Sequence, residues 1–483
     1  MAESLNSSLS MQEQDRSDAA LYDAVHGLRE RDPLASAAVA FVPWQKWAGG
    51  AMIVALVVAL VLAPTGTLVV LTALCTLTYL VTLADRVLLL SRGLARDSIL
   101  TVTDERARAL KEDELPAYTV LVPAYNEPEV IGDLIASMNA LEYPGDKLEV
   151  LLLLEADDQV TIEAAQAAGL GEVCRIMPIP PAEPRTKPKA CNYALHYAKG
   201  DIVTIYDAED QPDPLQLRRV VAAFGELDDD VACIQAKLAF HNGAQNVLAA
   251  WFTADYALWF NFLLPGLMKS DSPIPLGGTS NHFRAEVLAD VGAWDPHNVT
   301  EDADLGVRIA VRGYRTAVLD STTMEEANPD PINWIRQRSR WYKGYLQTWL
   351  VHMRQPVALW RALGPRRMFR FTTLLAGTPV IACLNMVFWL VTLSWVLGQP
   401  AIVAEVFPPY VYFPALICLV LGNATILYSN LVAVRETNNQ DLWLACLTVP
   451  LYWVLMSIAA IKGTYQLFAN PSYWEKTVHG LAK

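Results

Sequence analysis

Two clusters of carboxylates each follow a short apolar run typical of a buried β-strand. Leu148–Leu154 is followed by Glu155–Asp158, and Ile202–Ile205 is followed by Tyr206–Asp210. In an open α/β sheet, ligands bind outside the carboxyl ends of the strands. Two acidic clusters at one edge repel each other unless a cation or a donor-rich ligand lies between them. A hard cation that shares its shell with phosphate oxygens would fit, although each cluster alone is more simply explained by turns and helix N-caps.

Three further segments carry residues that could serve phosphate or sugar chemistry. Lys187–Asn192 opens a helix-like stretch, where a lysine could meet a docked phosphate or simply be solvated. Thr300–Asp302 could supply a proton acceptor, or it could simply begin a helix, with the threonine as its N-cap and the two acids in its first turn. Gln337–Trp341 combines a guanidinium suited to a pyrophosphate with an indole suited to a sugar face, but both groups also suit lipid headgroups.

Alternating short elements between residues 98 and 330 are expected to position these side chains. The alternation of β-rich runs with helix-like segments predicts an α/β domain with a parallel sheet. The predicted strands are Tyr118–Val122, Leu148–Leu154, Ile202–Ile205 and Val231–Gln235, and the predicted helices are Val130–Leu141, Thr161–Ala168, Ala190–Ala198 and Leu215–Glu226.

Long uncharged blocks flank this domain. Before it, Trp47–Ala63 and Thr67–Ala84 are separated by a turn and predict a hairpin of two membrane-spanning helices, since a span needs about 20 apolar residues. Arg86, Arg92 and Arg96 follow at once, which places the chain on the cytoplasmic face there, with the polar N-terminal arm on the same side. That arm, residues 1–33, is expected to be mobile or a short peripheral helix.

Three more uncharged blocks follow the domain, over residues 371–404, 406–434 and 442–461. Five spans in all would put the C-terminus outside, whereas Lys462, Lys476 and Lys483 favour the inside, so three or four C-terminal helices remain open. Between the domain and these blocks, basic and aromatic residues at helical spacing predict an amphipathic helix in the membrane interface. These residues are Trp334, Trp341, Tyr342, Tyr345 and Trp349 with Arg336, Arg338, Arg340 and Lys343.

The composition agrees with this division. The 483 residues are 53% hydrophobic and only 18% charged, and the formal net charge is −14, which disfavours binding to nucleic acid. Seven cysteines without a CxxC pair support neither a zinc site nor a disulfide framework. The predicted parts are an N-terminal arm (1–43), a transmembrane hairpin (44–97), a catalytic domain (98–330), interfacial helices (331–370), transmembrane helices (371–469) and a tail (470–483).

Taken in order, these motifs resemble the membrane-embedded, processive family 2 glycosyltransferases, such as cellulose and hyaluronan synthases. The resemblance runs from Tyr118 to Leu346. The matching elements are Pro123–Glu127 (P-x-Y-N-E), Asp157-Asp158, Lys189 with Asn192 (K-A-x-N), Asp207–Glu209 (D-x-D), Gly277–Ser280, Thr300–Asp302 (T-E-D), and Gln337, Arg340 and Trp341 (Q-x-x-R-W). The second acid of D-x-D is here a glutamate followed directly by Asp210.

The resemblance implies a GT-A-like α/β domain, with a mixed or parallel sheet, inserted between transmembrane helices. It implies that Asp302 is the general base and that Asp207 and Glu209 hold Mg²⁺ or Mn²⁺, with Asp210 as an alternative to Glu209. The implied donor-binding residues are Asp157, Asp158, Lys189, Asp207, Gln337, Arg340 and Trp341. The implied acceptor-binding residues are Gly278, Thr279, Glu301 and Trp341.

The implied activity is inverting, processive extension of a β-linked polysaccharide from a UDP-sugar, with UDP-glucose as the first choice. The chain would be a multi-pass protein of the cell membrane with a cytoplasmic catalytic domain, and would export the growing glycan through its own channel. Aromatic and amide side chains of the spans would line that channel: Trp389, Trp395, Tyr428, Trp443, Tyr452 and Trp453 with Asn385, Asn423 and Asn430. The alternatives are transfer of one sugar to a polyprenyl phosphate or other lipid, and a scaffold without activity.

Overall fold

The computed structural model describes residues 2–95, 97–476 and 480–481, so Arg96 and Lys483 of the predicted charge pattern lie outside the described residues. The chain divides into two compact units, each built from three stretches. Unit 1 comprises Met1–Ala38, Ile99–His241 and Pro273–Glu326, and unit 2 comprises Val39–Ser98, Asn242–Ser272 and Ala327–Lys483. The stretch 242–272, which lies inside the predicted catalytic range 98–330, therefore groups with the apolar flanks.

Unit 1 is built on an eight-stranded mixed sheet with the order β3-β2-β1-β4-β7-β6-β8-β5. Its first half is parallel, as predicted: β1 (Tyr118–Ala124) pairs with β2 (Leu148–Glu155) and with β4 (Ile202–Ile205), and β2 pairs with β3 (Cys174–Ile179). Strands β1, β2 and β4 are almost fully buried, which explains why they form continuous apolar runs rather than alternating ones.

The second half of the sheet departs from the parallel sheet that the alternation of elements predicts, and agrees with the mixed sheet that the resemblance allows. The short strand β7 (Asn281–Arg284) runs antiparallel to both β4 and β6 (Val231–Phe240). Strand β8 (Arg315–Glu325) is parallel to β6, and β5 (Gln211–Pro212) is antiparallel to β8. Because Asn281 pairs with Ile205, the loop that precedes β7 arrives at the carboxyl end of β4. The sheet thus delivers this loop to the acidic turn after β4.

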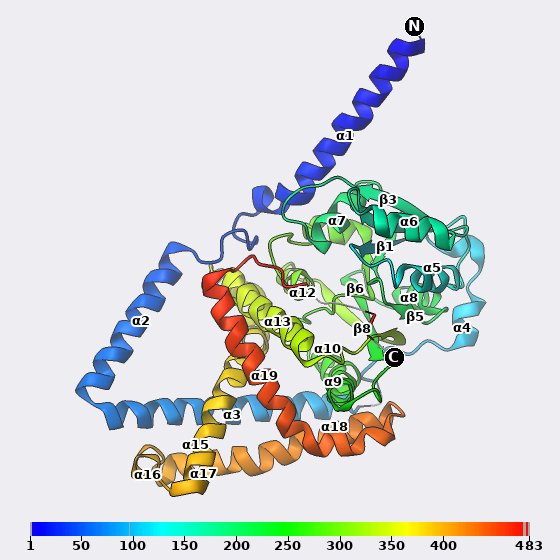
Figure 1. The fold of residues 1–483 in the computed structure, drawn as a ribbon. Helices are drawn as coiled ribbons and strands as arrows, with labels where there is room; N and C mark the ends of the chain where they lie inside the picture. The colour runs from blue at the N-terminus through cyan, green and yellow to red at the C-terminus, as the bar shows by residue number, and fades with distance from the viewer. Residues whose placement is uncertain (1, 96, 477–479, 482–483) are drawn as a thin grey trace. The chain divides into compact units, whose positions relative to one another are not determined.

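Helices complete unit 1 (Figure 1). The predicted helices are found within a few residues of their expected bounds, and the N-terminal arm is a 30-residue helix, α1, rather than a mobile segment. The helices are α1 (Ala2–Arg31), α4 (Asp104–Ala109), α5 (Ile131–Asn139), α6 (Gln159–Ala168), α7 (Lys187–Leu195), α8 (Gln216–Phe224), α11 (Ala285–Asp290) and α12 (Glu301–Val311).

Unit 2 is helical. Among the described residues, six helices are long and apolar enough to cross a membrane, judged by length and composition: Pro43–Leu62, Pro64–Gly93, Val247–Lys269, Pro356–Gly398, Pro409–Glu436 and Gln440–Ala469. Five of them correspond to the predicted blocks. The sixth, Val247–Lys269, is not among them, because Asp255 and Asn261 interrupt its apolar sequence. Its apolar window is 72% buried, so it lies inside unit 2 rather than on its surface.

The remaining elements of unit 2 include the two helices that cover the predicted interfacial segment, residues 331–370. Helix α13 (Pro331–His352) and helix α14 (Pro356–Phe371) precede α15 (Thr378–Gly398). Helix α14 is kinked at Gly364, whose φ of 71° is left-handed. The other helices are α2 (Pro43–Leu62), α3 (Pro64–Gly93), α9 (Val247–Leu258), α10 (Leu264–Lys269), α16 (Ala401–Val406), α17 (Pro409–Ile417), α18 (Asn423–Glu436) and α19 (Trp443–Ala469).

Candidate active site

The acidic turn after β4 is held by its last member. Asp210 is fully buried, and its Oδ2 accepts hydrogen bonds from the backbone N–H of Asp207, at 2.7 Å, and from the hydroxyl of Thr279. Its Oδ1 is buried without a hydrogen-bond partner. By contrast, Asp207 and Glu209 are only half-buried. Asp210 therefore shapes the turn, and the two half-buried acids are the ones within reach of a ligand.

The loop 277–280 is fastened across the end of β4. The N–H of Ser280 donates to the carbonyl of Ile205 at 2.8 Å, and the Thr279 hydroxyl, whose single proton is shared with Asp210, lies 3.1 Å from the same carbonyl. The buried side chain of Gln235 accepts from the N–H of Gly277 at 2.8 Å and donates to the carbonyl of Thr279 at 3.0 Å. These bonds fix Gly278 directly beside the acidic turn.

Three charged side chains from different elements surround Gly278. A Cβ atom placed on Gly278 would lie 3.6 Å from Oδ2 of Asp302, 3.8 Å from Oδ2 of Asp207 and 3.9 Å from Nζ of Lys187. None of these three atoms would clash with it. The absent side chain of Gly278 thus leaves a small space that two carboxylates and one ammonium group share.

Lys187, at the start of α7, is the cation of this group. Its ammonium pairs with Asp207 and donates to the carbonyl of Gly278 at 2.7 Å. Burial lowers the pKa of Lys187, but the carboxylates of Asp207 and Glu301 outweigh burial and hold that pKa above its usual range. The ammonium therefore stays charged, in a position to neutralise an anion or a developing negative charge.

Lys189, which the resemblance assigns to donor binding, forms a buried ion pair, and its role toward the donor stays a prediction. Its side chain is fully buried, and its ammonium lies 2.5 Å from the carboxylate of Glu155 at the end of β2. The lysine beside Gly278 is instead Lys187, two residues earlier. The sequence indicates the start of this helix as part of the site, but the motif favours the other lysine.

Asp302 lies in the first turn of α12. Its Oδ1 accepts from the N–H of Ala303 at 2.7 Å, and its Oδ2 faces Gly278. Its neighbour Glu301 is buried and acts electrostatically on Lys187. Asp302 can thus accept a proton from a group bound beside Gly278.

The pair Asp157 and Asp158 follows β2 at the same edge of the sheet, and its two members differ. Asp158 is buried: it accepts from the N–H of Thr161 at 3.2 Å, which caps α6, and from the N–H of Asn126 at 2.5 Å. Asp157 is more exposed and pairs with Arg185 at 2.7 Å. Asp158 therefore fixes the loop after β1, and Asp157 is the more accessible carboxylate.

This edge of the sheet carries more acidic than basic side chains. Burial, followed by the charges of Asp207 and Glu209, raises the pKa of Asp210 far above its usual range. Glu325, at the end of β8, has its pKa raised by burial and by the same acidic group. The sequence motifs do not reveal Glu325, because only the parallel pairing of β8 with β6 brings it to this edge. Crowding of acids at this edge of the sheet favours a bound cation.

The residues present fit a divalent cation only if the ligand completes its shell. Within the described ranges, no group of three or more His, Cys, Asp or Glu side chains is arranged to hold a metal ion. Mg²⁺, however, is commonly bound by one or two carboxylates together with phosphate oxygens and water. Asp207 and Glu209 are the predicted pair, and Asp207 already attracts the ammonium of Lys187.

The remaining predicted residues lie in unit 2, on α13. Trp341 packs against two aromatic residues of α9, with ring centroids 6.0 Å from Phe252 and 6.4 Å from Tyr256. The guanidinium of Arg340 lies 4.6 Å from the ring centroid of Trp474. The Oε1 atom of Gln337 is buried without a hydrogen-bond partner. Their predicted roles toward donor and acceptor stay predictions.

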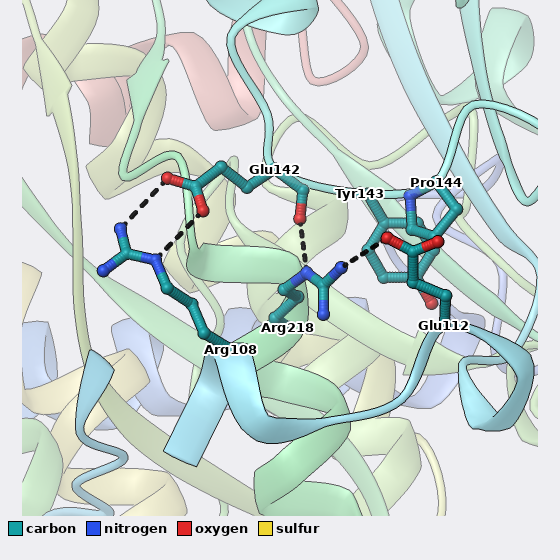
Figure 2. A pocket seen from close by; sticks show the side chains of 6 residues that line it. All are labelled: Arg108, Glu112, Glu142, Tyr143, Pro144 and Arg218. Atoms are coloured by element: carbon teal, nitrogen blue, oxygen red, sulfur yellow. Dashed lines mark hydrogen bonds and ion pairs between the residues drawn. The ribbon is translucent and has the colours of Figure 1, made fainter. Parts of the chain in front are cut away.

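A pocket of about 280 Å³ lies at the opposite edge of the sheet (Figure 2). Its lining residues precede β1 and β2 or belong to α8: Arg108, Glu112, Glu142, Tyr143, Pro144 and Arg218. The charged side chains of this pocket are paired, since Arg108 makes a bidentate ion pair with Glu142 at 3.1 and 3.2 Å. Because strand amino ends rarely form the ligand site of such sheets, this pocket is not the candidate site.

Comparison with known proteins points to one family. The family model described as "Glycosyltransferase like family 2" matches residues 116–344. A beta-monoglucosyldiacylglycerol synthase of Synechocystis is 26% identical over 280 residues, which cover 57% of this chain and 58% of that protein. A probable glucomannan 4-beta-mannosyltransferase of Arabidopsis thaliana is 26% identical over 242 residues, 48% of this chain and 43% of that protein.

Among solved structures, a mannosyltransferase from Pyrobaculum calidifontis in complex with GDP-Man and Mn²⁺ matches with 20% identity and a TM-score of 0.48, over 79% of this chain and 99% of that chain. The chain spans less than two thirds of the length of the curated relatives named above. The family match includes Lys187, Asp207, Gly278 and Asp302, which surround one point in the structure. Residues 116–344 of this chain are therefore a glycosyltransferase family 2 domain.

Proposed function

We propose that the chain is a membrane-bound, inverting glycosyltransferase that uses a UDP-sugar, with UDP-glucose as the first choice, to extend a β-linked glycan. The observation that carries this proposal is the convergence of Asp302, Asp207 and Lys187 around Gly278. One proton acceptor and one cation-attracting carboxylate beside the same small space are what transfer from a nucleotide sugar to a hydroxyl group requires.

The reaction is a single displacement. The acceptor hydroxyl attacks the anomeric carbon of the donor, its proton passes to Oδ2 of Asp302, and the bond to the diphosphate breaks with its electron pair on the departing oxygen. Attack from the face opposite the leaving group inverts the anomeric centre, so an α-linked donor gives a β-linked product. No covalent nucleophile from the protein is needed.

The departing diphosphate gains negative charge, and this chain offers three means to balance it. Asp207 and Glu209 would hold Mg²⁺ or Mn²⁺, which supplies positive charge at the diphosphate oxygens when bound. Lys187 lies beside Asp207 and can contribute a hydrogen-bond donor to the same oxygens. Arg340 of α13 is proposed to add a guanidinium, as its place in the Q-x-x-R-W motif implies.

The donor nucleobase is proposed to bind at the end of β2. The more exposed carboxylate of Asp157 would contact it, while Asp158 would support that contact by fixing the loop after β1. On the acceptor side, Thr279 would act by holding the loop, because its hydroxyl is committed to Asp210 and Ile205. Gly278, Glu301 and Trp341 would border the acceptor sugar, with Gln337 beside the donor.

Unit 2 is proposed to hold the enzyme in the cell membrane with its catalytic domain in the cytoplasm. The six apolar helices support this. Helix Val247–Lys269 does not count as a crossing, because β6 before it and β7 after it pair in one sheet and must lie on the same side. The other five helices leave the conflict with the basic C-terminal residues as the sequence states it. Export of the glycan through a channel lined by aromatic residues of these helices is part of the same proposal.

A lipid acceptor is the second candidate. It is favoured by the match to the beta-monoglucosyldiacylglycerol synthase, whose name states a lipid product, over 57% of this chain. The match to a glucomannan mannosyltransferase favours the polysaccharide instead. Product size distinguishes the two hypotheses. A lipid acceptor gives a product with one sugar added per lipid molecule, whereas a glycan acceptor gives a series of polymers of increasing length.

The test is incubation of the purified full chain in detergent or nanodiscs with a panel of nucleotide sugars, with and without EDTA. Release of nucleoside diphosphate, product length and digestion by linkage-specific hydrolases are measured. We expect release from a UDP-sugar, inhibition by EDTA and a product cut by a β-specific hydrolase. Failure of every donor, under conditions in which the protein is folded, would refute the proposal and favour a scaffold without activity.

A further inference from the structure

Residues 13–38 lie outside the range matched by the family model and yet pack within unit 1. The C-terminal half of α1 lies along α7 (Figure 1). Its buried residues, Ala20, Ala24, Val25 and Leu28, recur at helical spacing and form one face. Two of these four residues are alanines, which lets α1 approach its neighbours closely. The segment that follows is also anchored, since Ser36 and Ala37 are both 1% exposed.

Polar contacts fix the register of α1 on α7. The hydroxyl of Ser17 lies 2.9 Å from the hydroxyl of Tyr193. The guanidinium of Arg16 donates to the carbonyl of His196 at 3.3 Å and lies 5.1 Å from the ring centroid of Tyr197. Each contact is weak alone, but they lie at one end of α7 and determine where α1 sits along it.

Asn192 joins three segments. Its Nδ2 donates to the carbonyl of Ala24 in α1, at 3.3 Å, and to the carbonyl of Trp294, at 2.7 Å. Its Oδ1 accepts from the N–H of Trp294 at 3.2 Å. All three bonds are to backbone atoms, so they depend on where α1 and the Trp294 loop lie and not on which side chains those segments carry. Asn192 therefore ties α7 to both α1 and the loop that leads to α12.

That loop, residues 291–298, is held from two further sides. Asp295 is fully buried and accepts from the N–H of Ala37 at 2.5 Å and from the hydroxyl of Ser36 at 3.2 Å. From α12, Arg308 donates to the carbonyls of Val291 and Ala293, both at 2.6 Å. The loop thus connects α7, the segment after α1 and α12 through buried hydrogen bonds.

Two of the helices connected in this way begin at the candidate active site. Helix α7 starts with Lys187, and the first turn of α12 contains Asp302. We propose that residues 13–38 act as a buttress that sets the positions of Lys187 and Asp302 beside Gly278, with Asn192 and Asp295 as positioning residues. This inference rests on the proposed function for its kinetic consequence. Its structural part, the coupling of α1 to the loop 291–298, can be measured independently.

The main test is Asn192→Leu in the full chain, which keeps the side chain's size and removes its hydrogen bonds. We expect kcat to fall roughly 10-fold to 100-fold, because small displacements of reacting groups cost that much. The KM for the nucleotide sugar should rise less than kcat falls, since Lys187 is the only one of the groups proposed at the diphosphate that this loop positions. The matched control is Asp18→Ala, on the exposed face of α1. There the carboxylate accepts a hydrogen bond only from Gln14 of the same helix among the contacts described, so this variant should keep wild-type kcat.

A milder variant covers the case in which Asn192→Leu does not fold. The double variant Arg16→Ala/Ser17→Ala removes only contacts at the surface of α7, and should lower kcat about threefold to tenfold. In both variants, hydrogen exchange should rise at the amides of α7 and of residues 291–298, but not at the amides of β2 and β3. Unchanged exchange in these segments, or wild-type kcat in a folded Asn192→Leu, would overturn the inference.

The outcomes also separate this inference from the proposed function. If the wild-type chain transfers no sugar from any donor, the proposed function fails, while the exchange experiment still decides whether α1 supports the loop. If the wild type is active and both variants exchange and react like it, the buttress alone is refuted.

Discussion

The two edges of the sheet in unit 1 use charge in opposite ways. At the amino ends of β1 and β2, Arg108 and Arg218 are matched by Glu142 and Glu112, and the contacts are satisfied within the protein (Figure 2). At the carboxyl ends, a larger group of acids lies around the ammonium of Lys187: Asp207, Glu209, Asp210, Glu301, Asp302 and Glu325.

The difference distinguishes a structural charge cluster from a candidate site. Paired charges at a surface contribute little to the free energy of folding, and they are balanced without a bound ligand. Like charges held close together in a partly buried turn raise the free energy of the unliganded state, and a bound cation or donor-rich ligand lowers it. Matched charge at one edge and excess charge at the other therefore locate the chemistry at the second edge, although the pocket of Figure 2 lies at the first.

The largest expected effect comes from Asp302→Asn. Removal of the proton acceptor should lower kcat by about 10² to 10⁴, the usual contribution of a general base. The KM for the donor should change little, since Asp302 faces the acceptor side of Gly278 in the proposed mechanism. Release of nucleoside diphosphate in the presence of acceptor measures the effect. Asp290→Asn, an exposed change at the end of α11, is the control, and equal activities of the two variants would remove Asp302 from the mechanism.

Asp207→Asn should follow, with a loss of about 10² to 10³ in kcat/KM, because it weakens charge stabilisation at the diphosphate. The concentration of Mg²⁺ or Mn²⁺ for half-maximal activity should rise at the same time. Titration of each metal into the EDTA-treated enzyme measures this. If the variant has a reduced rate but an unchanged metal requirement, Asp207 does not bind the metal and acts only through its ion pair with Lys187.

Glu209 and Asp210 can be separated in the same titration. Glu209→Gln should raise the half-maximal metal concentration at least about tenfold, as expected when a coordinating group is weakened. Asp210→Asn should leave it nearly unchanged, because an amide oxygen can still accept from Thr279 and from the N–H of Asp207. If instead Asp210→Asn raises the half-maximal metal concentration and Glu209→Gln does not, Asp210 is the metal ligand and Glu209 does not bind the metal.

The smallest effect is expected at the opposite edge. Arg108→Ala removes an ion pair whose partners are 54% and 45% exposed, so it should lower the free energy of unfolding by at most about 1 kcal/mol. Activity and metal requirement should equal those of the wild type. A thermal melt and one kinetic assay check both points, and a large loss of activity here would break the contrast between the two edges.

Much of the site-bearing half of the sheet can be predicted from sequence. Strands β1, β2 and β4 are continuous apolar runs, and the acids that follow them fall at one edge by the rule for parallel sheets. The order of the motifs along the chain then selects Asp207 and Asp302 as site residues. These predictions depend on local patterns, which the sequence displays directly.

Other features depend on contacts between distant segments and cannot be predicted in this way. The choice between Lys187 and Lys189 turns on which face of a short helix meets the sheet, because two residues on a helix differ by about 200°. Glu325 reaches the site only through the pairing of β8 with β6. The packing of α1 is hidden because half of its buried face is alanine, which gives a weak apolar pattern, and Val247–Lys269 is hidden because Asp255 interrupts its apolar sequence.

The central claim is that the space beside Gly278 is where the reacting groups meet, and a side chain placed there tests it most directly. Gly278→Val would fill the space between Asp302, Asp207 and Lys187, while Gly145→Val adds the same side chain before β2, where a Cβ has only Val173 nearby at 3.9 Å. We predict that Gly278→Val melts near the wild-type temperature but loses at least about 10² in kcat/KM, and that Gly145→Val keeps wild-type activity. Wild-type kcat/KM in a folded Gly278→Val variant would contradict the account.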